Sequence, residues 1–360
     1  MTVQQKTTLA KRSEILFFYD SRMSNPNGDP DKNKPRFDSE TQKIYVTEFR
    51  LKRTIRKYLD EVMVGYKILL RQELDEQLEK EQGEEGFKML DKLAKDYIDM
   101  IEGGKNKKYE IPKIKRDELL ADHIDIRLFG IMFVVGKENF KSNKEVKAGL
   151  SFKQVGPVQF AIGQSLNTMK EDTDIIRIGM TLLVPNTKNE AGISKGGSFG
   201  EKWIVRYAFI QHHGFVNNNI AKDVNLTERD VNAMLTAMWN GTDMLATTSK
   251  FGQKSRLLVK VNYKANGYIG DLDLMTRLEY NKVETLEDIT QLTLNLDGLL
   301  DILKNNKDII DNVEFQYNPV LTCRYYDKVG TFDKIIKDWS KDSEITMSKL
   351  NFSSISKDEE

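Results

Sequence analysis

Two amphipathic helix patterns, each lying between apolar runs that are typical of β-strands, indicate the order of the elements along this chain. The first run, "SEILFFY" at 13–19, is followed by helical spacing over 47–62. Strand-like runs at 156–164 and 202–211 come next, then a second helix at 227–241 and a strand at 256–263. The order strand, helix, strands, helix, strand predicts an α+β fold on the split β-α-β-β-α-β plan. This is the ferredoxin-like or RNA-recognition-motif arrangement.

Both helices carry recognisable start signals. Thr47 is an N-cap candidate, and Leu51, Ile55, Tyr58, Leu59 and Val62 follow it at helical spacing. In "LTERDVNAMLTAMWNG", Thr227 and Asp230 make a capping-box pattern. Gly241 stands where a helix commonly ends on a glycine, so we expect the second helix to stop there.

Two insertions interrupt this plan. Residues 66–122 are highly charged and poor in β-branched residues, which indicates an inserted helical subdomain. The strand-like runs 174–184 and 202–211 flank the glycine-rich stretch 185–201, which predicts a long hairpin arm. The run "DIRLFGIMFVV", 125–135, reads as a further strand. The rest of the chain, 1–65 and 123–360, is assigned to the main domain.

Composition narrows the function classes. No apolar run approaches the roughly 18 residues of a membrane span, and the N-terminus lacks the apolar region of a signal peptide. Cys323 is the sole cysteine, so a reducing, cytoplasmic compartment is expected. The sequence has no metal or nucleotide motif, and the adjacent His212 and His213 would face opposite sides of a strand. We therefore expect no metal and no cofactor.

Charge is neutral in total, with 55 basic and 55 acidic residues, but it is unevenly distributed. Bases gather at 50–57, 105–115 and 250–256, and acids at 73–85. The proline-rich loop "SNPNGDPDKNKPR", 24–36, leads into the first helix, whose opening turns are crowded with Arg and Lys. A helix N-terminus favours anions, so a bound phosphate backbone would offset that crowding. The alternative is a solvated basic face paired with nearby acids.

At this point several segments together resemble a known family. They are "FFYDSRMSNPNGDPDKNKPRFD", "RLKRTIRKYL", "DIRLFG", "GPVQFAIGQSLN", "GGSFGEKWIVRYAFIQHHGFVN" and "LTERDVNAMLTAMWNGTDMLATTSKFGQKSRLLVKVNY". In this order they resemble the backbone subunit of type I CRISPR Cascade complexes, most closely its type I-B branch, within the RAMP superfamily. Only the charged insert is poorly constrained by the resemblance.

The resemblance implies a non-catalytic protein with an RNA-recognition-motif-like palm, a helical finger at 66–122 and a hairpin thumb at about 185–201. Copies of such a subunit stack along a guide crRNA as a helical filament, grip its backbone and expose bases that pair with target DNA. The implied partners are crRNA, target DNA, copies of itself, other Cascade subunits and a recruited helicase-nuclease. The function implied is antiviral defence.

Site residues carry over by position in the matching segments. The candidates for RNA contact are Asn25, Asn27, Gly28, Arg50, Lys52, Arg53, Arg56, Lys250, Gln253 and Arg256. The candidates in the thumb are Lys195, Phe199 and Lys202. Thr248 stands where we expect an arginine, so the basic cluster beside Lys250 is thinner than the family pattern. The usual aromatic signature on the central strand is absent, so bases are not expected to stack on the sheet.

An enzyme is the alternative. Related type III backbone subunits cleave target RNA with an aspartate and a divalent metal, and Asp20, Asp29, Asp31 and Asp38 lie in or near the proline-rich loop. Carboxylates are the ligands that Mg²⁺ prefers. Asp29, however, stands in "NGDP", where an aspartate commonly caps its own turn.

Overall fold

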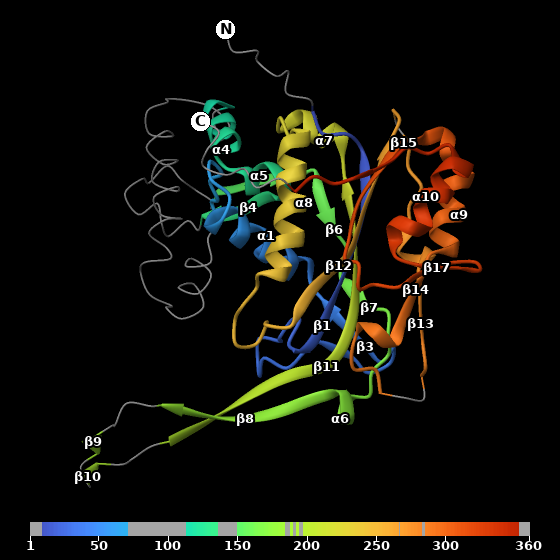
Figure 1. Ribbon diagram of the computed structural model, residues 1–360. Helices are drawn as coiled ribbons and strands as arrows, with labels where there is room; N and C mark the ends of the chain where they lie inside the picture. Colours follow the sequence, from blue (N-terminus) through green and yellow to red (C-terminus); the bar gives the residue numbers. More distant parts are fainter. Residues whose placement is uncertain are drawn as a thin grey trace, which may run out of the picture.

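The computed structural model describes residues 9–70, 113–135, 150–183, 188–189, 192–193, 197–265, 267–282 and 285–352 (Figure 1). A large sheet with the strand order β18-β15-β12-β1-β11-β7-β3-β2 runs through the molecule, and β6 and β8 also pair with β11. Its strands are β1 (Ser13–Ser24), β2 (Phe37–Asp38), β3 (Lys43–Val46), β6 (Val158–Phe160), β7 (Gly163–Ser165), β8 (Ile175–Leu183), β11 (Gly197–Val216), β12 (Gln253–Tyr263), β15 (Ile310–Tyr317) and β18 (Met347–Lys349).

The central strand is β1, which pairs antiparallel with β11 on one side and with β12 on the other. Phe17, for example, lies opposite His212 of β11 and Leu258 of β12. The first nine residues of β1 are all buried, so both of its faces are covered. A strand covered on both faces reads as a continuous apolar run rather than an alternating one.

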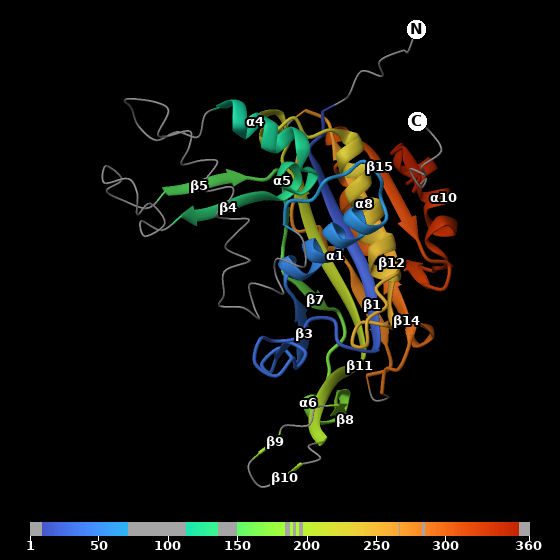
Figure 2. The same ribbon diagram turned by 90° about the vertical axis from the view of Figure 1, so that its left-hand side faces the viewer.

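Helices α1 (Glu48–Glu61) and α8 (Glu228–Asp243) lie against one face of the sheet (Figures 1 and 2). Thr47 caps α1 and accepts a hydrogen bond from the backbone N–H of Arg50, and the capping box of Thr227 and Asp230 starts α8. Leu51, Ile55 and Leu59 are buried in the core between helix and sheet. Both helix starts were thus predicted correctly, and so was the α1 stripe except at Val62, which is exposed and follows the last residue of the helix.

The opposite face is covered by the C-terminal part of the chain. Helices α9 (Asp297–Asn305) and α10 (Phe332–Ser343) lie on this face (Figure 1), with the small sheet β13-β14-β16-β17. The small sheet contains β13 (Arg277–Tyr280), β14 (Leu292–Asn295), β16 (Cys323–Tyr325) and β17 (Lys328–Gly330). Phe18 of β1 and Val259 of β12 belong to this second core, so the centre of the sheet is closed to bases from either side.

The predicted hairpin is present. β8 pairs with the first half of β11 from Ile175 opposite Val205 to Leu183 opposite Gly197, and the pair extends away from the sheet (Figure 1). We call this pair, 175–183 with 197–205, the arm. Two short strands, β9 (Lys188–Asn189) and β10 (Gly192–Ile193), pair near its end, and the short helix α6 (Glu171–Asp174) precedes it.

The interpretation of 125–135 as one strand is wrong in its first half. Ile124–Phe129 form helix α5, and the strand β4 (Gly130–Val135) begins only afterwards, paired with β5 (Leu150–Val155). Gly130, at φ 75°, marks the change. A short run that is buried on all sides has no periodicity to separate helix from strand. The run 156–164 is likewise divided, into β6 and β7.

Gly241 does not end its helix, because α8 continues to Asp243. A Cβ on Gly241 would lie 3.1 Å from Cβ of Tyr58 and 3.2 Å from the carbonyl oxygen of Thr54, both on α1. The glycine therefore permits the close approach of α1 and α8 rather than a left-handed cap.

The ends of the predicted insert enter the main core. Ile68 and Leu69, and Leu120 of α4 (Lys113–Asp122), pack with α1 and α8. Residues 71–112, the centre of the predicted finger, lie outside the described residues. Another short helix, α7 (Asn218–Asp223), follows β11. Among the helices of the described ranges, none is long and apolar enough to cross a membrane.

Candidate nucleic-acid interface

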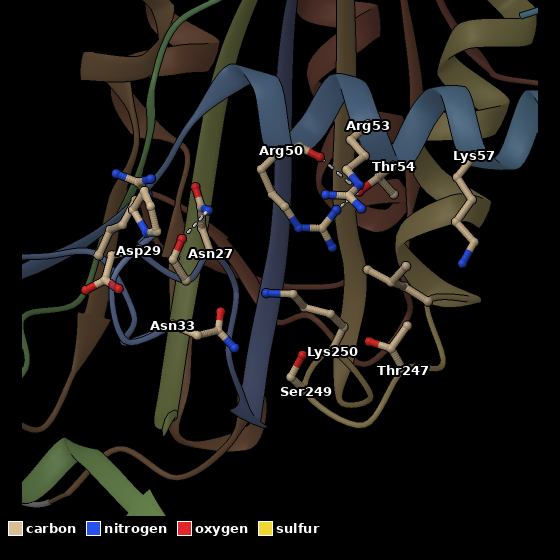
Figure 3. A pocket seen from close by; sticks show the side chains of 14 residues that line it. Asn27, Asp29, Asn33, Arg50, Arg53, Thr54, Lys57, Thr247, Ser249 and Lys250 are labelled. Carbon is tan, nitrogen blue, oxygen red and sulfur yellow. Dashed lines mark hydrogen bonds between the residues drawn. The ribbon is translucent and has the colours of Figure 1, made fainter. Parts of the chain in front are cut away.

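A cavity of about 840 Å³ lies between the proline-rich loop, α1 and the loop that joins α8 to β12 (Figure 3). Its lining includes five cationic side chains and one carboxylate, Asp29. The cations are Arg36, Arg50, Arg53, Lys57 and Lys250. Asn27, Gly28, Asn33, Thr54, Thr247 and Ser249 are among the other lining residues. This cationic cavity is the candidate interface.

Asn27 fixes the loop to the start of α1. Its Oδ1 accepts hydrogen bonds from the backbone N–H of Thr47, at 2.9 Å, and from the Thr47 hydroxyl, at 3.0 Å. Asn25 fixes the loop internally, since its Nδ2 donates to the carbonyl of Asn33 at 2.6 Å. The loop and the helix N-terminus therefore present their polar groups to the cavity as one unit.

Helix α1 supplies three of the cations at helical spacing. Arg50, Arg53 and Lys57 recur at three and four residues, and Figure 3 shows their side chains on the cavity side of the helix. A guanidinium nitrogen of Arg50 donates to Oγ1 of Thr54 at 2.8 Å. The Nε atoms of Arg50 and Arg36 are buried without a hydrogen-bond partner, so both retain a donor that an anion at the cavity could use.

Lys250 faces these arginines from the opposite loop (Figure 3), and its Nζ donates to the carbonyl oxygen of Asn25 at 2.6 Å. Burial, followed by the charges of Arg50 and Arg53, lowers the pKa of Lys250 to about 7. Burial and the charge of Arg53 also lower the pKa of Arg50 to about 10. Crowded cations of this kind are stabilised by a bound anion, which restores the pKa of the lysine.

Five of the ten predicted contact residues line the cavity, and five do not. Asn25 and Gln253 are buried beside it, where Nε2 of Gln253 is 3.4 Å from the Asn25 carbonyl. Lys52 is buried, with Nζ 3.4 Å from Oε1 of Gln159. Arg56 donates through Nε to the buried Asp125 at 3.2 Å. Arg256 donates through Nε to the buried Asp20 at 2.9 Å.

Two cavity cations, Arg36 and Lys57, were missed by sequence reasoning. For Lys57 the signal was present, because it follows Arg53 by four residues and Arg50 by seven, on one helix face. The same rule separates Lys52 and Arg56, which share a different face. The basic run 50–57 was treated as one cluster, so the two faces of the helix were not distinguished.

The arm residues are only partly described. Lys202 lies near the base of the arm, opposite Ile178, and its ammonium donates to the carbonyl of Thr248 in the loop that borders the cavity. The side chain of Phe199 and all of Lys195 lie outside the described residues.

Three of the four candidate aspartates, Asp20, Asp29 and Asp38, are engaged in local structure. Asp29 Oδ1 accepts from the backbone N–H of Lys32 at 2.8 Å, and Asp38 Oδ2 accepts from the Thr41 hydroxyl at 2.7 Å. Asp20 is buried against Arg256 and Tyr207. Nowhere in the described ranges do three acidic, histidine or cysteine side chains gather as a metal site.

His212 and His213 face opposite sides of β11, as the strand reading requires. Burial lowers the pKa of His212 to about 4. Burial also opposes the charged form of His213, but its hydrogen bonds to Asp273 and Glu14 raise its pKa to about 9. The two rings thus have separate, structural environments.

Comparison with known proteins gives the family. Residues 11–297, well over half of the chain, match the family of CRISPR-associated protein Cas7. The chain belongs to the Cas7 family. A Cas7 protein of Haloferax volcanii is 28% identical over 315 residues, which cover 85% of this chain and 86% of the relative. The family predicted from the quoted segments is confirmed.

Solved structures are less similar to this Cas7 protein than the Haloferax volcanii sequence is. A chain of a CRISPR RNA-guided surveillance complex in a pre-nicking state has a TM-score of 0.44 and 12% identity, covering 92% of this chain and all of that one. A chain of the type III-B Cmr-beta complex bound to cognate target RNA has a TM-score of 0.33 and 11% identity, covering 70% of this chain and 61% of that one. The family assignment therefore rests on the sequence match.

Proposed function

We propose that this Cas7 protein is a non-catalytic backbone subunit of a type I CRISPR interference complex, or Cascade. In this proposal, copies of the chain polymerise along the spacer of a guide crRNA, bind its phosphates and present its bases for pairing with target DNA. Other Cascade subunits and a recruited helicase-nuclease complete the pathway.

The cationic cavity carries this proposal. Five cations against one carboxylate favour a polyanion, and the cavity offers donors but little aromatic surface on which to read bases. Such an interface binds a nucleic-acid backbone irrespective of sequence, which is what a subunit that accepts any guide requires. Both faces of the central sheet are covered, so bases cannot stack on it. This supports RNA binding at the cationic cavity.

The strand order supports the palm assignment. Read as β1, α1, β7, β11, α8 and β12, the chain places its strands in the order β12-β1-β11-β7, with neighbours antiparallel. This is the arrangement expected of a split β-α-β-β-α-β palm. In this proposal the arm is the thumb, and the insert 66–122 is the finger.

A metal-dependent RNA endonuclease of the type III kind is the alternative, and the hydrogen bonds of Asp29 and Asp38 favour a turn-forming role for both carboxylates instead.

The proposal is tested by purifying the tagged chain from cells that carry its CRISPR array. We expect RNA of one uniform length to co-purify, and complementary RNA to stay intact with Mg²⁺. Cuts at regular intervals that are lost on Asp29→Ala or Asp38→Ala would support the endonuclease.

Binding of single-stranded RNA is expected to depend on pH through Lys250. In the free protein the pKa of Lys250 is lowered to about 7. A bound phosphate raises this pKa, so RNA binding is coupled to the uptake of a proton by Lys250. Affinity should therefore be highest below pH 7 and fall about tenfold between pH 7 and 8.5. Lys250→Arg, which keeps its charge throughout, should flatten this profile, whereas Lys57→Arg should not. Identical profiles for the wild type and Lys250→Arg would remove Lys250 from the interface.

A further inference from the structure

The cationic cavity places a lysine amine directly beside donors for a small anion. The side chain of Lys250 faces Arg50 and Arg53 across the cavity (Figure 3), and Arg36 lines the same space. The Nε atoms of Arg36 and Arg50 are buried without a hydrogen-bond partner. A small anion in the cavity therefore has arginine donors around it and an amine next to it.

The contacts of Lys250 suit an uncharged amine. Its Nζ donates to the carbonyl oxygen of Asn25 at 2.6 Å, so its acceptor is a neutral oxygen rather than a carboxylate. Burial, followed by the charges of Arg50 and Arg53, lowers the pKa of Lys250 to about 7, so roughly half of the amines are unprotonated at neutral pH. A desolvated lysine beside other cations is an activated nucleophile.

Lys57, the other lysine in this lining, is held differently. Its Nζ lies 3.7 Å from Oε1 of Glu61, so a carboxylate provides its counter-charge. Asp29, the carboxylate of the lining, accepts a hydrogen bond from the backbone N–H of Lys32 instead. Lys250 and Lys57 thus share one cavity but differ in the group that holds the amine, which makes Lys57 an internal reference.

We propose that Lys250 is a site of covalent acylation by acyl phosphates, small anions in which a phosphate oxygen is bonded to an acyl carbon. The arginines bind the phosphate, and Nζ of Lys250 attacks the acyl carbon. An amide bond forms between Nζ and this carbon, and the bond between the carbon and the phosphate oxygen breaks. Inorganic phosphate leaves with the bonding electron pair, the nitrogen loses a proton to water, and no oxidant or further reactant is needed.

The consequence of this modification rests on the proposed function. An acylated Lys250 carries no charge and cannot regain one, so the cavity loses one of its five cations. The acyl group also takes up space between the proline-rich loop and α1. Since the phosphates of a bound RNA would occupy the same arginines, RNA and acyl phosphate should exclude each other. Acylation therefore acts on chains that have not yet bound RNA.

Acetyl phosphate is the probe for the first test. The full-length chain, freed of RNA by high salt and nuclease, is incubated at pH 7.5, and acetylated peptides are followed over time by mass spectrometry. At this pH the unprotonated fraction of Lys250 is on the order of 500-fold larger than that of an unperturbed lysine. A weaker base is also a weaker nucleophile, which offsets part of this advantage. We therefore expect Lys250 to be acetylated about tenfold faster than Lys57.

Inorganic phosphate separates anion binding from mere reactivity. It competes with acetyl phosphate for the arginines, so an excess should slow acetylation of Lys250 much more than that of Lys304, an exposed lysine on α9. Equal acetylation rates for Lys250 and Lys57 would overturn the proposal. Acetylation of Lys250 that phosphate slows no more than that of Lys304 would also overturn it, because no anion would then be held beside the amine.

RNA provides the second test. Saturation with single-stranded oligoadenylate should slow acetylation of Lys250 about tenfold or more and leave Lys304 unaffected. Treated wild type should bind oligoadenylate about tenfold more weakly than untreated protein, since one hydrogen bond to a charged group is lost. Lys250→Arg, which has no amine at this position, should show no such loss on treatment, whereas Lys57→Arg should show the loss of the wild type.

The outcomes distinguish the two proposals. If the wild type shows no salt-dependent binding of oligoadenylate but Lys250 is acetylated fast, the proposed function fails and the acylation site stands. If oligoadenylate binds in a salt-dependent way and Lys250 reacts no faster than Lys57, the acylation site alone fails. Bound oligoadenylate that leaves the acetylation of Lys250 unchanged would refute a shared site. Thermal unfolding midpoints verify that Lys250→Arg and Lys57→Arg are folded.

Discussion

Simultaneous replacement of Arg50, Arg53 and Lys57 by glutamine is expected to reduce affinity for single-stranded RNA by roughly a thousandfold at physiological salt. The three side chains project from one face of α1 into the cationic cavity. A hydrogen bond to a charged group contributes about 1.5 kcal/mol or more, and three such losses give this factor. The slope of log affinity against log salt should also fall by about two units, at roughly 0.7 for each phosphate contact on a single strand.

A matched triple replacement controls for net charge. Lys304, Lys337 and Lys341 are exposed on α9 and α10, on the other face of the sheet. Their replacement by glutamine removes the same charge and should leave the slope unchanged. Filter binding or fluorescence anisotropy across a salt series measures both variants, and equal losses in both would show that attraction is diffuse rather than located in the cavity.

Asp125→Ala is expected to have the largest effect on stability, lowering the free energy of unfolding by about 3–5 kcal/mol. Asp125 is fully buried. Its carboxylate accepts from the backbone N–H of Leu69 at 3.0 Å, from that of Leu70 at 3.1 Å, and from Arg56 Nε at 3.2 Å. Its removal takes this carboxylate away from the largely buried guanidinium of Arg56 and from two backbone donors.

Urea denaturation compares this variant with Asp122→Ala. Asp122 pairs with Lys67 across 3.6 Å with both side chains exposed, so its loss should change the unfolding free energy by less than about 1 kcal/mol. Arg56→Gln should lower stability and leave the RNA salt slope as it is. If Arg56→Gln reduces the salt slope without loss of stability, Arg56 contacts RNA, as the sequence analysis predicted.

The sequence predicted the central plan because its signals are local. Capping residues at Thr47 and Thr227 and the stripe through Leu51 and Ile55 depend on neighbours within one or two turns. The 125–135 interpretation failed because a run buried on all sides carries no periodicity. Gly241 was misassigned because its reason lies on another helix, at Tyr58.

Buried polar side chains could not be predicted for the same reason, because their partners are distant in the sequence. Lys260 of β12 is buried, and its Nζ lies 2.8 Å from a carboxylate oxygen of Glu228 and 3.1 Å from one of Glu314. Those partners lie on α8 and β15, far away along the chain, and no local pattern announces them. For the site, the basic run located the right helix, but only helical spacing separates Arg53 and Lys57 from Lys52 and Arg56.

Cross-linking of the co-purified RNA to the protein, followed by mass spectrometry of the cross-linked peptides, locates the RNA on this chain. We expect cross-links to peptides that contain the proline-rich loop 24–36, the α1 segment 47–57 and the loop 245–250, which border the cationic cavity. Peptides from α9 and α10 should carry none. Cross-links concentrated on α9 and α10, with none on the three cavity segments, would contradict the proposal that RNA binds at the cationic cavity.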